Sequence, residues 1–397
     1  MNIKIKKSTA SGEIFAPPSK SIAHRNLICA FLAKDESEIS ALSFSEDIKA
    51  TINCIKALGG AVEIVGDTVK IKGGNLTVKE ELFCNESGST LRFFVPIALL
   101  LDQRVTFRGA KRLFERPLDI YEEICKENGF FFEKGEDYLT VKGKLKAGVY
   151  MLPGDVSSQF ITGLLFALPL CDGDSVIKIL PPFESASYVD LTLQSLKDSG
   201  INIKKEGNNF FVKGNQSYKA INKAVEGDMS NAAFLYAFNA LGGNVTVKGI
   251  NENTLQGDRV YKEIIDTMIE KNETFDVSDC PDLVPVLMVV AAMNKGATFT
   301  GTRRLKIKES DRASVMKQEL ENAGGKVNVF ENSIEVFPFN PLENKVAKGH
   351  NDHRIVMSMA LLFTLCGGEI EGADAVKKSY PDFFEKISTL GIIAEKS

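Results

Sequence analysis

The sequence predicts an α/β (α+β) protein of two globular domains, each made of three β-α-β-α-β-β units around buried parallel helices. Three features predict this class. Six long apolar runs recur along the 397 residues, an amphipathic segment follows each of them, and alternating, strand-like sequence lies between. Such regular recurrence indicates internal duplication of one supersecondary unit.

The six apolar runs have the character of buried helices. Each begins with small polar or acidic residues of the type that caps helix N-termini, and continues with apolar residues on nearly every side. The first is PPSKSIAHRNLICAFLA (17–33) and the last is HNDHRIVMSMALLFTLCGG (350–368). Successive starts lie 66, 70, 73, 52 and 70 residues apart when they are marked at Ser21, Ser87, Ser157, Ser230, Asp282 and Asp352.

The second helix of each unit is amphipathic, as in DIKATINCIKALGG (47–60), and several of these segments end in glycine, which helix C-termini favour. After each of the first five we expect alternating strands, as in KVNVFENSIEVF (326–337). Six units with buried central helices predict two domains of three units each rather than an open array.

Composition limits the possible functions. The formal net charge is −4, which argues against a nucleic-acid-binding protein held by bulk positive charge. Seven scattered cysteines without a CxxC pair predict buried free thiols in a reducing compartment. His350 and His353 have no clear third ligand nearby, so we expect no metal site.

No segment predicts a membrane location. The longest apolar runs, such as FFVPIALLL (93–101), are far shorter than the roughly 18 residues of a membrane-spanning helix. The start MNIKIKK is charged and no apolar segment of a signal peptide follows it. We therefore expect a cytoplasmic protein.

Positive and small polar residues gather at the starts of the apolar helices. Helix N-termini carry unpaired N–H groups and partial positive charge, so these ends favour anions. If the ends of three helices from each domain face one another, they form a cleft for a small, multiply charged anion. The residues at these ends and in the connecting segments are Lys20, Ser21, Arg25, Gly88, Ser89, Thr90, Arg92, Arg116, Ser157, Ser158, Gln159, Asp282, Lys308, Glu309, Arg312, His353, Arg354 and Lys378.

Ordered motifs along essentially the whole chain carry a resemblance to a known family. The motifs are PPSKSIAHR, NESGSTLR, FERP, SSQF, SASYVDLT, CPDLVP, KIKESDR, NDHR and KKSYPDFF. In this order they resemble EPSP synthases, the enolpyruvyl transferases of the shikimate pathway. The resemblance implies the two-domain enolpyruvyl-transferase fold, an inside-out α/β barrel. It places one domain at 1–18 plus 226–397, the other at 19–225, and two crossovers near 16–20 and 224–228.

The resemblance also implies a reaction of aromatic amino-acid (chorismate) biosynthesis. Phosphoenolpyruvate transfers its enolpyruvyl group to the 5-hydroxyl of shikimate 3-phosphate and phosphate is released, by addition and elimination through a tetrahedral intermediate. No metal or cofactor is implied. The expected partners are these two small molecules, with no nucleic acid and no membrane, and we expect a monomer.

Site residues follow from the resemblance by motif. It implies catalysis by Asp282, Glu309 and Lys20. By analogy, Asp282 transfers the hydroxyl proton, and Glu309 transfers the methylene proton with help from Lys20. The residues themselves leave open which carboxylate has which role. Shikimate 3-phosphate is expected at Lys20, Ser21, Arg25, Ser157, Ser158, Gln159, Ser185, Tyr188, Asp282 and Lys308. Phosphoenolpyruvate is expected at Lys20, Gly88, Arg116, Gln159, Arg312, Arg354 and Lys378.

One position departs from the pattern, and two alternatives remain. Arg304 stands where related sequences often carry asparagine or histidine, which leaves that substrate contact open. A UDP-N-acetylglucosamine enolpyruvyl transferase would usually carry a cysteine in the segment that matches 105–117, which has none here. A non-catalytic anion-binding protein would gain nothing from Asp282 and Glu309 beside cations. Because Gly88 is retained, we expect sensitivity to glyphosate.

Overall fold

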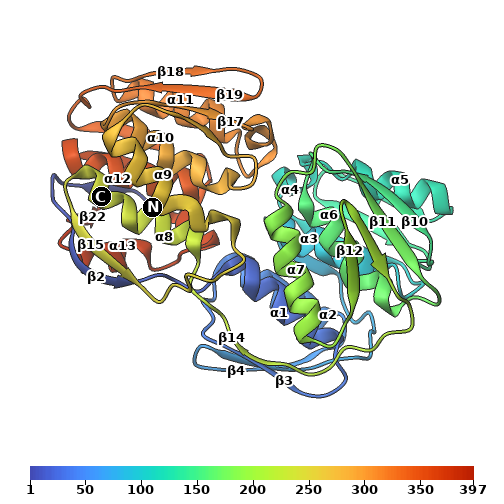
Figure 1. The fold of residues 1–397 in the computed structure, drawn as a ribbon. Helices are drawn as coiled ribbons and strands as arrows, with labels where there is room; N and C mark the ends of the chain where they lie inside the picture. Colours follow the sequence, from blue (N-terminus) through green and yellow to red (C-terminus); the bar gives the residue numbers. More distant parts are fainter. The chain divides into compact units, whose positions relative to one another are not determined.

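The computed structural model describes residues 1–397 and divides the chain into two compact units. Unit 1 contains Met1–Pro17 and Glu226–Ser397, and unit 2 contains Pro18–Val225. In Figure 1 unit 2 runs from blue to light green, while unit 1 is yellow to red and also includes the dark blue N-terminal strands. Each unit has its own hydrophobic core.

Unit 2 contains three mixed four-stranded sheets, ordered β14-β3-β5-β4, β6-β7-β9-β8 and β10-β11-β13-β12. Their strands are β3 (Ser37–Ser40), β4 (Ala61–Val65), β5 (Thr68–Lys72), β6 (Leu82–Asn85), β7 (Val105–Gly109), β8 (Phe131–Lys134), β9 (Tyr138–Lys142), β10 (Val149–Pro153), β11 (Ser175–Leu180), β12 (Ile203–Glu206), β13 (Asn209–Val212) and β14 (Asn222–Ala224). Its helices are α1 (Lys20–Leu32), α2 (Glu46–Ala57), α3 (Gly88–Ala98), α4 (Lys111–Glu115), α5 (Asp119–Asn128), α6 (Ser158–Ala167), η1 (Leu168–Leu170) and α7 (Ala186–Asp198).

Unit 1 contains two four-stranded sheets, β20-β21-β1-β22 and β16-β17-β19-β18, and the pair β15-β2. Its strands are β1 (Ile3–Ile5), β2 (Ser11–Phe15), β15 (Asn244–Lys248), β16 (Thr274–Asp276), β17 (Ala297–Thr300), β18 (Lys326–Val329), β19 (Ser333–Phe337), β20 (Lys345–Lys348), β21 (Gly368–Glu371) and β22 (Ala394–Lys396). Its helices are α8 (Met229–Tyr236), η2 (Ala237–Leu241), η3 (Gly257–Val260), α9 (Tyr261–Glu270), η4 (Pro281–Leu283), α10 (Val284–Met293), η5 (Arg303–Ile307), α11 (Arg312–Asn322), α12 (His353–Cys366), η6 (Ala373–Lys378) and α13 (Phe383–Ser388).

The predicted α/β class with repeated units is confirmed, with one exception. In four of the six sheets a parallel pair is extended by an antiparallel hairpin, as when β6 pairs with β7 and β7 with the hairpin β8–β9. In a fifth sheet the parallel pair β20–β21 is extended by the antiparallel strands β1 and β22. The fourth sheet consists of β2 and β15 alone. The prediction of a strand pair directly after α9 is therefore wrong. The next strand, β16, pairs with β17 of the following sheet.

Two sheets are completed by strands from distant parts of the chain. The N-terminal strand β1 lies between β21 and β22, so that Ile3 is opposite both Ile370 and Lys396. In unit 2, β14 pairs with β3, and Ala224 is opposite Ser40. Each unit therefore closes its repeat with a segment that lies at the other end of that unit in sequence.

The six apolar helices α1, α3, α6, α8, α10 and α12 are buried along most of their lengths, as their composition predicts. Ser87, Ser157 and Asp352 are N-caps whose side chains accept a backbone N–H. At α8 the cap is Asp228 rather than Ser230, and α1 begins after Ser19 rather than at Ser21. Asp282 lies in η4, just before α10.

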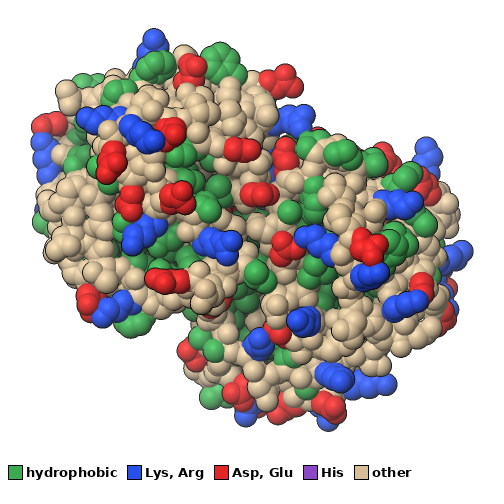
Figure 2. All heavy atoms as spheres, in the orientation of Figure 1, with side chains coloured by type: hydrophobic (Ala, Val, Ile, Leu, Met, Phe, Trp, Pro, Cys, Tyr) green, Lys and Arg blue, Asp and Glu red, His purple; other side chains and the backbone are tan.

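All seven cysteines are free and buried, as predicted. None of the helices combines the length and hydropathy that crossing a lipid bilayer requires. On the face drawn in Figure 2, basic and acidic side chains are interspersed, without one extended area of positive charge.

Close helix packing in unit 2 depends on Gly163. This residue lies on α6, which packs against α3, and a Cβ added there would be 2.3 Å from the Tyr121 hydroxyl and 2.4 Å from the Arg92 carbonyl. These two groups are hydrogen-bonded to each other, with a Tyr121 Oη to Arg92 O distance of 2.6 Å. A methyl group would therefore push α6 away from α3.

We predict that Gly163→Ala lowers the free energy of unfolding by about 1–3 kcal/mol through overpacking. In an unconstrained helix, Gly→Ala would instead raise the free energy of unfolding by about 1 kcal/mol. Urea unfolding followed by circular dichroism measures it. Gly148→Ala is the control, because no atom lies within 4 Å of its added Cβ. A Gly163→Ala variant as stable as wild type would show that the helices separate without cost.

Candidate active site

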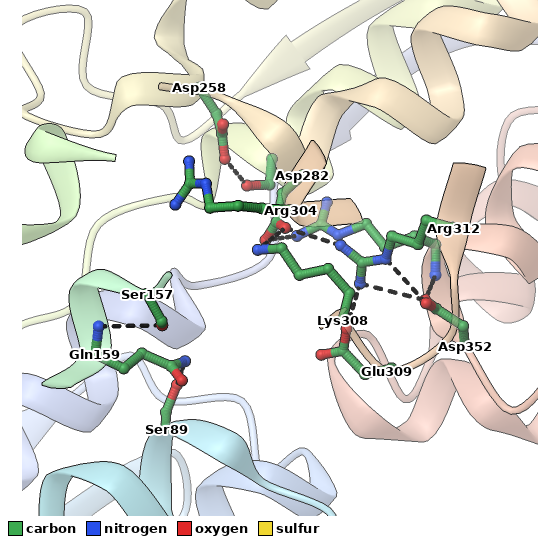
Figure 3. Close-up of polar contacts among 12 residues, drawn as sticks. Ser89, Ser157, Gln159, Asp258, Asp282, Arg304, Lys308, Glu309, Arg312 and Asp352 are labelled. Atoms are coloured by element: carbon green, nitrogen blue, oxygen red, sulfur yellow. Dashed lines mark hydrogen bonds and ion pairs between the residues drawn. The ribbon is translucent and has the colours of Figure 1, made fainter. Parts of the chain in front are cut away.

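Unit 1 gathers six charged side chains from four segments, which we call the Asp282 cluster (Figure 3). Asp282 comes from η4, and Lys308 and Glu309 follow η5. Arg312 is the first residue of α11, and the remaining two stand at the start of α12. The cluster consists of Asp282, Lys308, Glu309, Arg312, Asp352 and Arg354.

Arg312 holds the cluster together. Its side chain is 1% exposed, and its Nη1 donates to Asp282 Oδ1 at 2.8 Å and its Nη2 to Glu309 Oε2 at 2.7 Å. Its Nε donates to Asp352 Oδ2 at 2.9 Å. Burial by itself would lower the pKa of Arg312, but Asp352, Glu309 and Asp282 together hold that pKa well above its usual value.

Asp282 is surrounded by cations. Lys308 Nζ lies 3.2 Å from Asp282 Oδ1, and Arg354 Nη2 lies 3.3 Å from Oδ2. Burial alone would raise the pKa of Asp282, but Lys308, Arg354 and Arg312 outweigh burial and hold the pKa well below its usual value. Asp282 is therefore a carboxylate at neutral pH, next to three positive groups.

Lys308 has a lowered pKa. Burial is the largest cause, Asp282 opposes it, and Arg312 and Arg304 lower the pKa further. Arg304, the residue that departs from the family pattern, is buried and donates from Nη2 to the Ser278 carbonyl at 2.5 Å. Its guanidinium therefore adds positive charge near Lys308.

Asp258 is a buried carboxyl group that no motif of the sequence marks. It lies in η3, beside the start of α8, and accepts a hydrogen bond from the Ser230 hydroxyl (Figure 3). Burial and the negative charge of Asp282 raise the pKa of Asp258 to about 7, against the opposing effects of Ser230 and Arg354. Near neutral pH this carboxyl group therefore exchanges a proton close to Asp282.

Lys378 lies at the end of η6 and is 9% exposed. Its Nζ donates to the Asn351 carbonyl at 2.5 Å, just before the start of α12. Helix α12 and η6 are packed together. The predicted residue thus lies beside the segment that carries Asp352 and Arg354.

In unit 2, the first helix places Lys20 and Arg25. Lys20 Nζ forms an ion pair with Asp47 Oδ2 at 2.8 Å, and both side chains are largely buried. Arg25 donates from Nη1 to the Ser21 carbonyl at 2.6 Å and from Nη2 to the Tyr188 carbonyl at 2.9 Å. Burial lowers the pKa of Arg25 to about 10. The structure thus joins three of the predicted residues through one guanidinium group.

Gly88 and Arg116 lie in direct contact. A Cβ added at Gly88, the first residue of α3, would be 2.7 Å from Arg116 Nη1. Arg116 follows α4 and is 7% exposed. Only a glycine therefore lets this guanidinium lie against the start of α3.

Gln159 is oriented from both ends of its side-chain amide. Its Nε2 donates to Ser89 Oγ at 3.0 Å (Figure 3). Its Oε1 accepts from Arg92 Nη1 at 2.7 Å. Its backbone N–H donates to the hydroxyl of Ser157, the N-cap of α6. Ser158, the first residue of that helix, is buried.

Ser185 and Tyr188 stand at the start of α7. Ser185 is the buried N-cap and has a left-handed backbone, with φ of 55°. This conformation is uncommon for a residue other than glycine. The turn determines where the following residues point, among them Tyr188, whose carbonyl accepts from Arg25.

Sequence reasoning missed three partners of the predicted residues. Asp47 pairs with Lys20, and Asp258 lies near Asp282 without a motif that marks it. Asp352 was used only to mark a helix start, although it accepts from Arg312. The sequence signal for Asp352 was its position in the motif NDHR, where a carboxylate that caps a helix directly precedes two basic residues.

Comparisons with known proteins identify the family of this chain. The sequence profile of the EPSP synthase (3-phosphoshikimate 1-carboxyvinyltransferase) family matches residues 5–387. A 3-phosphoshikimate 1-carboxyvinyltransferase of Clostridium kluyveri is 42% identical over 98% of this chain and 97% of its own length. Its counterpart in Clostridium acetobutylicum is 41% identical, with the same coverage. The fold is similar to a solved EPSP synthase of Acinetobacter baumannii, with a TM-score of 0.80, 23% identity and full coverage of both chains.

The fold and the charged site thus define an enolpyruvyl-transferase type of protein. The chain belongs to the EPSP synthase family, which confirms the resemblance inferred from its motifs.

We predict that the raised pKa of Asp258 makes stability depend on pH. A carboxyl group whose pKa is higher in the folded than in the unfolded state stabilises the fold at low pH, and that contribution is lost as pH rises toward about 7. Asp258→Asn, which cannot ionise, should therefore gain stability relative to wild type between pH 5 and pH 8, by more than about 1 kcal/mol. Urea unfolding of both proteins at each pH measures the change. An unchanging difference would show that Asp258 is ionised throughout.

Proposed function

We propose that this chain transfers the enolpyruvyl group of phosphoenolpyruvate to the 5-hydroxyl of shikimate 3-phosphate and releases phosphate. The Asp282 cluster carries the proposal. It holds two carboxylates, Asp282 and Glu309, on a single buried arginine and places further cations beside them. A site of this composition can bind substrates with phosphate and carboxylate groups and still offers groups that exchange protons.

The reaction has an addition and an elimination step. In the addition, the 5-hydroxyl oxygen bonds to C2 of phosphoenolpyruvate and loses its proton, while the methylene carbon gains one. In the elimination, the bond from C2 to the phosphate oxygen breaks and the methyl carbon gives up a proton. The products are 5-enolpyruvylshikimate 3-phosphate and phosphate, and no redox change occurs.

Asp282 is proposed to take the hydroxyl proton. In the resting protein its pKa is well below the usual value, so it holds a proton only weakly. Substrate phosphate and carboxylate groups that engage Lys308 and Arg354 weaken their hold on Asp282, and its basicity rises when substrate is bound. Glu309, held by Arg312, and Lys20 are proposed to serve the methylene carbon.

The remaining residues are proposed to hold the two substrates. For shikimate 3-phosphate we retain Lys20, Ser21, Arg25, Ser157, Ser158, Gln159, Ser185, Tyr188, Asp282 and Lys308. For phosphoenolpyruvate we retain Lys20, Gly88, Arg116, Gln159, Arg312, Arg354 and Lys378. Buried arginines suit this task because they are already oriented before the anion binds. Arg312 is proposed to act mainly by orienting Asp282 and Glu309, since its nitrogens already contact three carboxylates.

The alternatives are less well supported. The relatives are named for shikimate phosphate chemistry, which does not favour a nucleotide-sugar acceptor. A purely anion-binding protein gains nothing from Asp282, which repels anions. We further propose a cytoplasmic monomer with the domain crossovers near 16–20 and 224–228.

Phosphate release from phosphoenolpyruvate tests the function, with shikimate 3-phosphate or UDP-N-acetylglucosamine offered as acceptor. Release with shikimate 3-phosphate alone is expected. Release with the nucleotide sugar alone would overturn the assignment of shikimate 3-phosphate as the acceptor. Binding of both substrates without any release would leave an anion-binding protein.

We predict that Asp282→Asn and Glu309→Gln each lower kcat by about 10²–10⁴-fold, the range for loss of a group that transfers protons. KM for either substrate should change by less than about tenfold, because binding rests on many other contacts. Glu331→Gln, which changes an exposed carboxylate of unit 1, should leave kcat unaltered. Near-normal kcat in both site variants would remove the two carboxylates from the mechanism.

We predict that Gly88→Ala raises KM for phosphoenolpyruvate about tenfold or more, because the new methyl group displaces the Arg116 guanidinium. KM for shikimate 3-phosphate should change much less. Glyphosate should inhibit wild type in competition with phosphoenolpyruvate and inhibit Gly88→Ala more weakly. Full wild-type activity at high glyphosate and low phosphoenolpyruvate would contradict the assignment of Gly88 to this subsite.

A further inference from the structure

The segment 349–352 joins β20 to α12 in a strained turn. His350 and Asn351 both have left-handed backbones, with φ of 48° and 53°. Such conformations are strained for residues other than glycine and persist only where other contacts enforce them. Gly349 must lack a side chain, because a Cβ there would be 2.7 Å from Val356 Cγ2 and 2.8 Å from the Gly372 carbonyl.

Two side chains of helix α11, Arg312 and Glu319, contact this turn. At the start of the helix, Arg312 donates to the Asp352 carboxylate. Two turns further along, Glu319 Oε1 lies 2.6 Å from His350 Nε2, and its other oxygen accepts the Lys348 backbone N–H at 3.3 Å. The Glu319 side chain is only 3% exposed, and the His350 side chain is 21% exposed. The two oxygens of the Glu319 carboxyl group therefore contact both the His350 ring and the backbone of β20.

The turn directs one backbone carbonyl at Lys378. The Asn351 carbonyl accepts from Lys378 Nζ at 2.5 Å, and Lys378 is itself 9% exposed. The backbones of His350 and Asn351 set the direction of this carbonyl, and the His350 ring in the same turn contacts Glu319. A chain of contacts therefore connects a buried carboxylate on α11 to the ammonium group of Lys378.

We propose that the His350–Glu319 pair is a positioning device that aims Lys378 and thereby sets the affinity for phosphoenolpyruvate. The proposal rests on the function proposed above, in which Lys378 contacts that substrate. Neither His350 nor Glu319 touches the reacting atoms. Their effect should therefore appear in the binding of one substrate and not in the chemical step.

The kinetic experiment compares His350→Ala and His350→Gln with wild type in the phosphate-release assay. His350→Ala should raise KM for phosphoenolpyruvate about tenfold, because misplacing a substrate-binding group weakens its contact. We expect kcat and KM for shikimate 3-phosphate to stay within about twofold of wild type. His350→Gln should restore most of the affinity, because its Nε2 amide can still donate to Glu319.

Two further variants separate positioning from general stability. Glu321→Gln changes an exposed carboxylate on the same helix, which pairs only with Lys317, and should leave every parameter unaltered. The double variant His350→Ala/Lys378→Ala should have the same KM for phosphoenolpyruvate as Lys378→Ala alone, because the histidine acts through the lysine. Tm measured for each variant reports any loss of stability.

The outcomes distinguish the two proposals. A selective rise in KM that His350→Gln reverses and that disappears in the Lys378→Ala background supports the positioning role. An active wild type whose His350→Ala variant keeps its KM, or whose effects add to those of Lys378→Ala, overturns that role alone. A wild type that releases no phosphate overturns the proposed function, and with it the assignment of Lys378.

Discussion

The charged site of unit 1 depends on one buried arginine. Arg312 contacts Asp282, Glu309 and Asp352, which come from three different segments. A buried guanidinium is stable only if its donors are satisfied, and buried carboxylates are stable only beside positive charge. Each group therefore makes the burial of the others possible. Loss of any one would leave the charges of the cluster unbalanced.

The same requirement explains why the helices begin where they do. α11 begins at Arg312 and α12 begins directly after Asp352, so the ion pair between them fixes two helix starts relative to each other. The Asp352 side chain also accepts the Arg354 backbone N–H at 2.9 Å. One carboxylate thus caps a helix, orients an arginine and places a second arginine next to Asp282.

Unit 2 uses hydrogen bonds to backbone carbonyls and to amides more than ion pairs. Arg25 and Arg92 each donate to at least one carbonyl, and each lies over an aromatic ring, Phe93 at 5.3 Å and Phe160 at 5.1 Å from the ring centroid. Because neutral acceptors leave the positive charge of an arginine uncancelled, these groups keep their attraction for anions. In unit 1, by contrast, much of the positive charge is balanced by carboxylates of the site itself.

Local sequence determined the repeat, the buried helices and several of their caps. These features depend on residues close together in the chain, such as Ser87 and Ser157 ahead of apolar runs. The motifs determined the family and the candidate residues. Only the tertiary structure decided that Arg312 meets carboxylates 30 and 40 positions away, that Lys20 pairs with Asp47 and that Asp258 lies near Asp282. It also decided that β1 completes a C-terminal sheet while the fourth sheet keeps two strands. The physical reason is that pairing between distant segments, and the pKa shifts that follow from it, depend on burial and distance, which no local pattern of residues records.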